Sequence, residues 1–248
     1  MDFRAALLEQ TRAFGELIRS ADPSTPVPTC PDWTLKQLFR HVGRGNRWAA
    51  QIIAERRTTP LDPREVRDGK PPDDPDAAID WLNAGARAVV SAVDRVGSER
   101  VWTFLGMRPA GWWIRRRLHE VAVHRADAAL ALGAGYDPPP ELAADCISEW
   151  IELMTVNATQ HSAPVERGRT MHLHATDDGL GPAGEWTIVN AEHGVTWTHD
   201  HGKGDVALRG PAKDLLLAIV RRRSAADGGV EIFGDIKVWD GWLERTPF

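Results

Sequence analysis

The chain has 248 residues, of which 42% are hydrophobic and 26% are charged, a composition typical of a globular protein with one large domain or two small ones. The formal net charge of −5 gives no general attraction to nucleic acid or to an anionic membrane. No apolar run approaches the ~20 residues that span a bilayer. The N-terminus carries acidic residues and no continuous apolar core, unlike a signal peptide, so we expect a cytoplasmic protein without nucleic-acid or membrane partners.

The first half of the chain is predicted to be helical. Apolar residues recur at helical spacing in four segments, over residues 3–19, 35–56, 76–96 and 111–132. Thr34 and Gln37 form a capping-box pattern at the start of the second segment, and Asp74 with Pro75 suits the start of the third. Gly133 ends the fourth. Four such helices joined by loops predict an antiparallel bundle.

The second half of the chain is predicted to contain both helices and strands. The linker GAGYDPPP precedes a fifth helix over residues 141–157, and we place the domain boundary near residue 158. Strands are then predicted from MHLHATD, EWTIVN, GVTWTHD and VALRG, followed by a helix over 212–223 and final strands in VEIFGD and KVWDGWL. The predicted fold class is α+β, with a helical domain over 1–158 and a small α+β domain over 159–248.

The segment HEVAVHRAD, from His119 to Asp127, has the pattern of a zinc protease with one residue too many. An α-helix turns ~100° per residue, so His119 and His124 point ~140° apart and do not share a metal ion. Glu120 and His124 are ~40° apart on neighbouring turns, so both can bind one ion. Asp127 continues the same edge of the helix.

A third ligand has to come from another helix. His41, in the second helix, lies on the stripe that is predicted to be buried, and Gly45 one turn further leaves open space beside its imidazole. Two histidines and one carboxylate inside a bundle make a three-ligand metal site with an open position. From the residues alone, the alternatives are a hydrogen-bonded core histidine at 41 and a simple surface pair of Glu120 with His124.

Other chemistry-bearing residues have more ordinary interpretations. Two histidine pairs alternate along predicted strands, which favours a solvated sheet face: His172 with His174 and His199 with His201. Cys30 and Cys146 have no metal-binding spacing and are expected to be thiols.

Two runs of arginine and three tryptophans are further candidates for functional residues. The run at residues 115–117 is expected to be a solvated helix face, except that Arg117 points toward the site. The run at 221–223 ends a helix, where cations suit the dipole or bind an anion. Three tryptophans could either form pocket walls or pack in the core: Trp48, Trp112 and Trp113.

The segments VPTCPDWTLKQLFRHVG and RRRLHEVAVHRAD resemble the mycothiol-dependent maleylpyruvate isomerase family, which belongs to the DinB-like metalloenzyme superfamily. GPAKDLLLAIVRRR, followed by VEIFGD, is similar to the C-terminal domain of that family. The likeness covers nearly the whole chain. It implies an N-terminal DinB-like four-helix bundle followed by a small sterol-carrier-type α+β domain.

The resemblance also implies roles for individual residues. The family's zinc ligands fall on the three residues that helix geometry selects, His41, Glu120 and His124; other divalent metals suit the same ligand types. Asp127 and Arg222 would bind the thiol cosubstrate, with Arg221 and Arg223 as alternatives in register. From the residues themselves, and not from the resemblance, Trp48, Trp113 and Arg117 are candidates for the pocket walls.

The implied activity is zinc-dependent use of mycothiol, whose activated thiol adds to a small electrophile. The enzyme would be a thiol S-transferase or a cis–trans isomerase such as maleylpyruvate isomerase. The partners would be the small thiol and the electrophile, and the protein a monomer or weak homodimer. The alternative is a non-catalytic metal- or ligand-binding, or regulatory, protein on the same fold. The residues do not name the electrophile.

Overall fold

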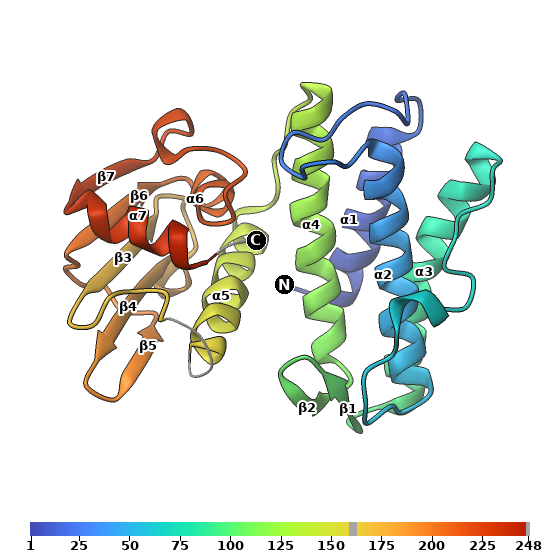
Figure 1. The fold of residues 1–248 in the computed structure, drawn as a ribbon, viewed down its shortest axis with the longest axis horizontal. Helices are drawn as coiled ribbons and strands as arrows, with labels where there is room; N and C mark the ends of the chain where they lie inside the picture. The colour runs from blue at the N-terminus through green and yellow to red at the C-terminus, as the bar shows by residue number, and fades with distance from the viewer. Residues whose placement is uncertain (159–162, 247–248) are drawn as a thin grey trace. The chain divides into compact units, whose positions relative to one another are not determined.

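The computed structural model describes residues 1–158 and 163–246. Its contacts divide the chain into two compact units, Met1–Tyr136 and Asp137–Phe248. The first is helical and the second combines helices with a sheet (Figure 1), which confirms the predicted α+β class. Among the described residues, every helix is too short or too polar to serve as a membrane span.

The first unit is a four-helix bundle. Its helices, all within described residues, are α1 (Phe3–Ile18), α2 (Leu35–Ala54), α3 (Pro75–Val96) and α4 (Trp112–Leu132). α1 and α2 each pack against both α3 and α4 (Figure 1). The predicted helices agree with these bounds closely, because each apolar stripe faces the shared core.

Local hydrogen bonds at the helix ends explain that agreement. The Gln37 side chain accepts a hydrogen bond from the Thr34 backbone N–H at 2.6 Å, which holds the start of α2. Asp74 accepts from the backbone N–H of Ala77 at 2.8 Å and caps α3. Gly133, with φ +62°, ends α4 in the left-handed conformation. Each such cap contributes about 1 kcal/mol, and all three are readable from sequence.

One element of the first unit was not predicted. Strands β1 (Arg100–Thr103) and β2 (Gly106–Pro109) form an antiparallel hairpin between α3 and α4. Each strand has only four residues and no alternation of polar and apolar side chains, so the usual strand signal is missing. The hairpin carries Phe104, which lines the pocket described below.

The second unit contains a sheet with the order β5-β4-β3-β6-β7, in which β3 and β6 are parallel and the other neighbours antiparallel. The described strands are β3 (Thr170–Ala175), β4 (Glu185–Ala191), β5 (Gly194–Thr198), β6 (Val206–Gly210) and β7 (Glu231–Gly234). The helices are α5 (Pro140–Asn157), α6 (Ala212–Ile219) and α7 (Ile236–Arg245).

The division between the units differs from the predicted boundary at residue 158, which adjoins residues 159–162 outside the described part. The contacts place the division between Tyr136 and Asp137, so α5 belongs to the second unit. α5 packs against α6. In addition, Ser148 on α5 accepts a hydrogen bond from the indole N–H of Trp186 on β4 at 2.9 Å. The apolar face of α5 therefore completes the core of the second unit.

Two other expectations for the second unit were wrong. The helix predicted over residues 212–223 ends at Ile219, before its three arginines. KVWDGWL forms α7 and not a strand, because Val238, Trp239 and Trp242 recur at helical spacing and are buried together.

Candidate metal site in the helical bundle

The bundle brings together the three residues that were predicted as ligands. His41 comes from α2, and Glu120 and His124 come from α4. His41 Nε2 lies 3.0 Å from Glu120 Oε1, and the two imidazole rings meet edge to face with their centroids 4.9 Å apart. One ligand atom from each residue lies within 4.8 Å of the others. A small movement is enough to place all three around one ion.

The protonation states of the site suit metal binding. Burial lowers the pKa of His124, although its hydrogen bond to Asp127 acts in the opposite direction. Burial raises the pKa of Glu120, but Arg117, His41 and Arg116 outweigh this effect and hold it well below its usual range. A neutral imidazole and an ionised carboxylate are the forms that donate electron pairs to a metal.

Asp127 is buried completely beside the site and contacts His124 directly. It accepts hydrogen bonds from His124 Nδ1 at 2.8 Å, from Thr29 Oγ1 at 2.6 Å and from Cys30 Sγ at 3.4 Å. The Nδ1 contact leaves Nε2 as the nitrogen with a lone pair for a metal, the usual arrangement of a metal-binding histidine. The prediction made Asp127 a thiol-binding residue; its burial and partners instead favour positioning of His124.

The Pro-rich segment before α2 forms one side of the site. Thr29 and Cys30 reach Asp127, and the Trp33 ring lies 4.9 Å from the ring of His41 and 6.3 Å from that of His124. Packing of this segment against α4 therefore fixes both histidines. Its PTCPDW sequence has no periodic signal for such a contact, which forms between residues far apart in the chain.

Sequence spacing missed the approach of Cys30 to the site. Cys30, His124 and Asp127 form another group whose possible ligand atoms lie within 4.8 Å. This group shares His124 with the first, so the two are not independent sites. Both Cys30 and Cys146 are thiols, as expected.

Arg117 is buried behind the site and holds Glu120. Its Nε donates to Asn46 Oδ1 at 3.0 Å, and its Nη1 lies 2.8 Å from Glu120 Oε1. A Cβ atom on Gly45 would lie 2.5 Å from Arg117 Nη2. Gly45 therefore makes room for the guanidinium; the open space predicted beside His41 is filled by Arg117.

Gly45→Ala is expected to lower the melting temperature and to weaken zinc binding. The new methyl group displaces a guanidinium that Asn46, the Val42 carbonyl and Glu120 all hold. Overpacking of this kind costs about 1–3 kcal/mol, more than the ~1 kcal/mol that alanine gains over glycine inside a helix. Melting curves and zinc titration measure both effects, with Gly135→Ala, where no atom crowds the Cβ, as the control. A more stable variant with unchanged zinc binding would contradict this role of Arg117.

Arg116 also departs from the expected solvated face. Its side chain is mostly buried and its Nη2 donates to Glu120 Oε2 at 3.1 Å. Each carboxylate oxygen of Glu120 therefore contacts a guanidinium. The two cations compensate the cost of burying this negative charge.

A pocket of about 450 Å³ opens over His41 and Glu120. Trp48, Trp113 and Arg117 line it, together with Trp33, Gln37, Arg40, Arg44, Gly45, Pro63 and Phe104. The indole N–H of Trp48 donates to the Leu61 carbonyl at 2.8 Å, and that of Trp113 to the Trp102 carbonyl at 3.1 Å. Both rings are therefore fixed walls, and a ligand in the pocket meets aromatic faces and cations beside the metal ligands.

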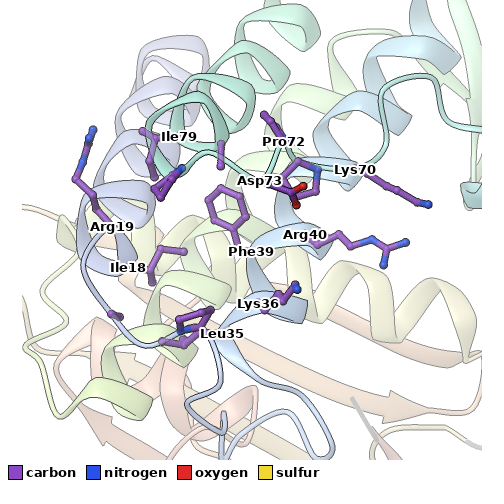
Figure 2. A pocket seen from close by; sticks show the side chains of 15 residues that line it. Ile18, Arg19, Leu35, Lys36, Phe39, Arg40, Lys70, Pro72, Asp73 and Ile79 are labelled. Atoms are coloured by element: carbon purple, nitrogen blue, oxygen red, sulfur yellow. The ribbon is translucent and has the colours of Figure 1, made fainter.

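Another pocket of the bundle lies at the Pro-rich loops, between α1, α2 and α3 (Figure 2). Its floor is apolar, with Phe39 and Ile79, and Lys36 and Lys70 stand at its rim (Figure 2). None of its lining residues belongs to the groups of described residues that could hold a metal. Of these two pockets, the one over His41 is therefore the one lined by possible metal ligands.

His119 and Arg222 are the remaining residues of interest. His119 is buried on α4 but is not part of the group formed by His41, Glu120 and His124. Arg222 lies in the second unit, beyond the end of α6 and not on its last turn. It is buried, and its Nη1 donates to the Val220 carbonyl at 2.8 Å. Arg221 and Arg223 beside it are exposed.

The donor set of the bundle site fits a divalent metal. Two imidazoles and one carboxylate are borderline ligands, typical of zinc sites that keep a fourth position for a substrate. The side chain of His41 is 40% exposed and that of Glu120 is 18% exposed, so the site is open on the pocket side. An incoming ligand can therefore reach a metal that these residues hold.

Comparisons with known proteins agree over both units. A family model described as the mycothiol maleylpyruvate isomerase N-terminal domain matches residues 4–129, and one described as the MDMPI C-terminal domain matches residues 141–241. Crystal structures of the mycothiol-dependent maleylpyruvate isomerase and of a histidine-to-alanine mutant are similar in fold, each with a TM-score of 0.63 over 99% of this chain and 95% of the other. Their sequence identities, 18% and 17%, make this a likeness of fold.

Curated relatives are similar over part of the chain. Two uncharacterized proteins of Mycobacterium tuberculosis, from strains CDC 1551 / Oshkosh and ATCC 25618 / H37Rv, are each 31% identical to it over 135 residues. The match includes 52% of this chain and spans 64% of the length of each relative.

Proposed function

The chain belongs to the mycothiol maleylpyruvate isomerase family, and from this premise we propose that it is an enzyme that uses mycothiol to attack a small electrophile. The observation that carries the proposal is the convergence of His41, Glu120 and His124 beneath a pocket with cationic and aromatic walls. The reaction is a cis–trans isomerisation or a thiol S-transfer.

The bundle residues hold the metal and set its surroundings. A zinc ion bound by His41, Glu120 and His124 would take the cosubstrate as a thiolate, whereas a thiol with a pKa of ~8.5 is mostly protonated at neutral pH. Asp127 keeps the proton of His124 on Nδ1. Arg117 keeps the Glu120 carboxylate ionised and fixed in orientation.

The two reactions share their first step. The thiolate sulfur forms a bond to the β-carbon of a double bond conjugated to a carbonyl, and the electron pair of that double bond moves onto the carbonyl oxygen. In isomerisation, the new single bond rotates, the electron pair returns, and the C–S bond breaks to release the thiolate and the trans product. In S-transfer, a proton from water ends the reaction, and the thioether is the product.

The pocket favours an electrophile with negative charge. Arg40, Arg44 and Arg117 line it, and with a divalent metal beside one carboxylate the local charge is strongly positive. Trp48 and Trp113 provide flat walls for a conjugated system. We therefore propose a small unsaturated carboxylate as the substrate class.

An assay with mycothiol and a panel of unsaturated carboxylates, maleylpyruvate included, tests this function. S-transfer consumes the thiol, whereas isomerisation changes the ultraviolet absorbance of the substrate without net loss of thiol. We expect a chelator to abolish either activity and added zinc to restore it. Zinc binding without turnover of any member of the panel would favour the binding-protein alternative.

We also propose that Arg222 binds the thiol cosubstrate. Arg222→Ala is then expected to raise the KM for mycothiol roughly 10- to 100-fold, since a hydrogen bond to a charged group contributes about 1.5–3 kcal/mol. The bundle metal should not be lost, because its three proposed ligands all lie in the first unit. Steady-state kinetics and elemental analysis give the two measurements. Arg221→Ala and Arg223→Ala are tested in parallel, because either residue could take this role in another register. If all three variants keep the wild-type KM, the second unit does not bind the thiol.

A further inference from the structure

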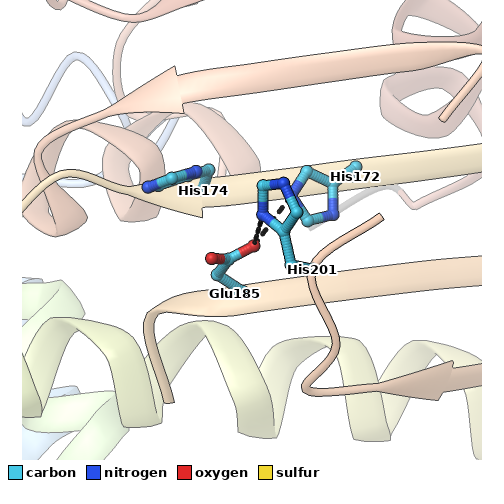
Figure 3. A group of neighbouring side chains, drawn as sticks. All are labelled: His172, His174, Glu185 and His201. Carbon is cyan, nitrogen blue, oxygen red and sulfur yellow. Dashed lines mark hydrogen bonds and ion pairs between the residues drawn. The ribbon is translucent and has the colours of Figure 1, made fainter. Parts of the chain in front are cut away.

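A second group of possible metal ligands lies on the sheet of the second unit: His172, His174, Glu185 and His201 (Figure 3). His172 and His174 alternate along β3 and so share one face, and the strand register places His174 opposite Glu185 on β4. His201 comes from the segment that follows β5 (Figure 3). One ligand atom from each residue lies within 4.8 Å of the others.

This group lies away from the hydrophobic core of its unit. Met171, Leu173 and Ala175 point to the other side of β3 and are buried in the core. His172 is nevertheless only 3% exposed, because the segment with His201 covers it. The solvated face expected for this histidine pair is therefore wrong for His172. His199 and His201 lie beyond the end of β5, not on a strand as expected.

Hydrogen bonds fix the proton of the buried His172. Thr187 Oγ1 donates its only proton to the Asp200 carbonyl at 2.8 Å, since a carbonyl oxygen can only accept. The contact between Thr187 Oγ1 and His172 Nδ1, at 3.1 Å, must then be a hydrogen bond donated by His172. A neutral His172 therefore carries its lone pair on Nε2. A metal-binding histidine typically has this second hydrogen bond on its other nitrogen.

The lone pair of His172 meets a negative charge. Nε2 lies 3.2 Å from Glu185 Oε2 and is buried without hydrogen-bond geometry. Two electron-pair donors at this distance repel each other unless a cation lies between them. We propose that this cation is a divalent metal of the zinc type, held by His172, His174, Glu185 and His201.

The alternative cation is a proton on His172 itself. Only 3% of His172 is exposed, and a charged imidazolium at such a buried position is costly. An ion-pair network would also leave His174 unexplained: among the described residues, its ring touches those of His172 and His201, and no hydrogen bond engages its nitrogens. A metal ion explains the convergence of all four side chains.

Four protein ligands indicate a structural site. Zinc bonds to imidazole and carboxylate at ~2.0–2.2 Å in a tetrahedron. His201 Nδ1, which lies 2.7 Å from Glu185 Oε2, would therefore have to move away from that oxygen, whereas the more distant ligand atoms would have to close in. His201 is the ligand that can move, because its side chain is 76% exposed and lies on a surface segment. With all four positions filled by protein, the ion would fasten this segment over β3 and leave no place for a substrate.

Zinc content and thermal stability of the full-length, untagged protein test the proposal. We expect two ions per chain in the wild type, one in His124→Ala, one in His201→Ala and none in the double variant. In the His124→Ala background, zinc should raise the melting temperature, and adding His201→Ala should abolish that rise. The affinity lost with His201 should be roughly 100-fold or more, because changes even to groups that only orient a metal ligand cost 10–100-fold.

Two controls keep this test specific. His193→Ala removes another exposed histidine of the same sheet, between β4 and β5, and should keep both ions. Glu185→Gln keeps the shape of the carboxylate but should lose the ion as His201→Ala does. If the bundle site were wrong, the wild type would hold one ion that survives His124→Ala. If His124→Ala binds zinc no better than the double variant, or if His193→Ala loses the ion equally, the second site does not exist.

Discussion

The His124→Ala variant is expected to lose the bundle metal and its mycothiol-dependent activity together. His124 is one of the three proposed protein ligands, and only His41 and Glu120 would remain. Because even residues that merely orient a metal ligand contribute 10–100-fold in affinity or activity, removal of the ligand itself should cost roughly 100-fold or more. Elemental analysis after dialysis and the thiol assay measure the two losses, and His41→Ala should reproduce both.

His119 provides the matched control on the same helix. It is a buried histidine five residues before His124, but it is not part of the group with His41 and Glu120. His119→Ala should therefore keep its metal, and His119→Gln serves as a second variant if alanine leaves too large a cavity. Equal loss of zinc from the His119 and His124 variants, with both proteins folded by circular dichroism, would mean that the site is not the one proposed.

Where the fold was predictable, short-range signals carried the information. The capping residues Thr34, Gln37 and Asp74, and the helix-ending Gly133, act within one turn of the chain, so their effect is visible in the sequence. The proposed ligands on α4 could be selected from the sequence for a related reason. Helix geometry alone separates His119 from the pair of Glu120 and His124.

The failures involve contacts between residues far apart in the chain. Arg117 fills the space at Gly45 only because α4 packs on α2 in one register. Thr29 and Cys30 reach Asp127 through a loop with no periodic pattern. The helical pattern of α5 does not show which core covers its apolar face, so the predicted boundary follows this helix whereas the division by contacts precedes it.

The proposed metal cluster of the second unit depends on a short-range pattern and on contacts between residues far apart in the chain. The alternation of His172 and His174 is visible in the sequence and does place both on one face of β3. Their partners are not visible, since Glu185 is brought opposite by strand register and His201 by the path of the chain after β5. Alternating histidines on a strand therefore indicate a metal site only once a third ligand is located.

Asp127→Ala is expected to weaken zinc binding by about 10–100-fold without removing a metal ligand. The change deprives the His124 ring N–H, the Thr29 hydroxyl and the Cys30 thiol of a buried acceptor. Each unsatisfied buried donor costs about 1–3 kcal/mol, so the variant should also unfold at lower temperature or denaturant concentration. More importantly, the His124 ring is then free to rotate or to move its proton to Nε2, and in either case its lone pair no longer faces the ion.

Asp127→Asn separates orientation from charge. The asparagine oxygen can still accept from His124 Nδ1 while its amide nitrogen faces the Thr29 hydroxyl, which rotates to accept. We therefore expect zinc affinity between those of the wild type and Asp127→Ala. The thiol KM, measured at saturating zinc, distinguishes this role from the one first predicted. If Asp127 positioned the metal ligand, zinc affinity would fall in both variants while the KM stayed near the wild-type value; a residue that binds mycothiol directly would raise the KM and leave zinc affinity unchanged.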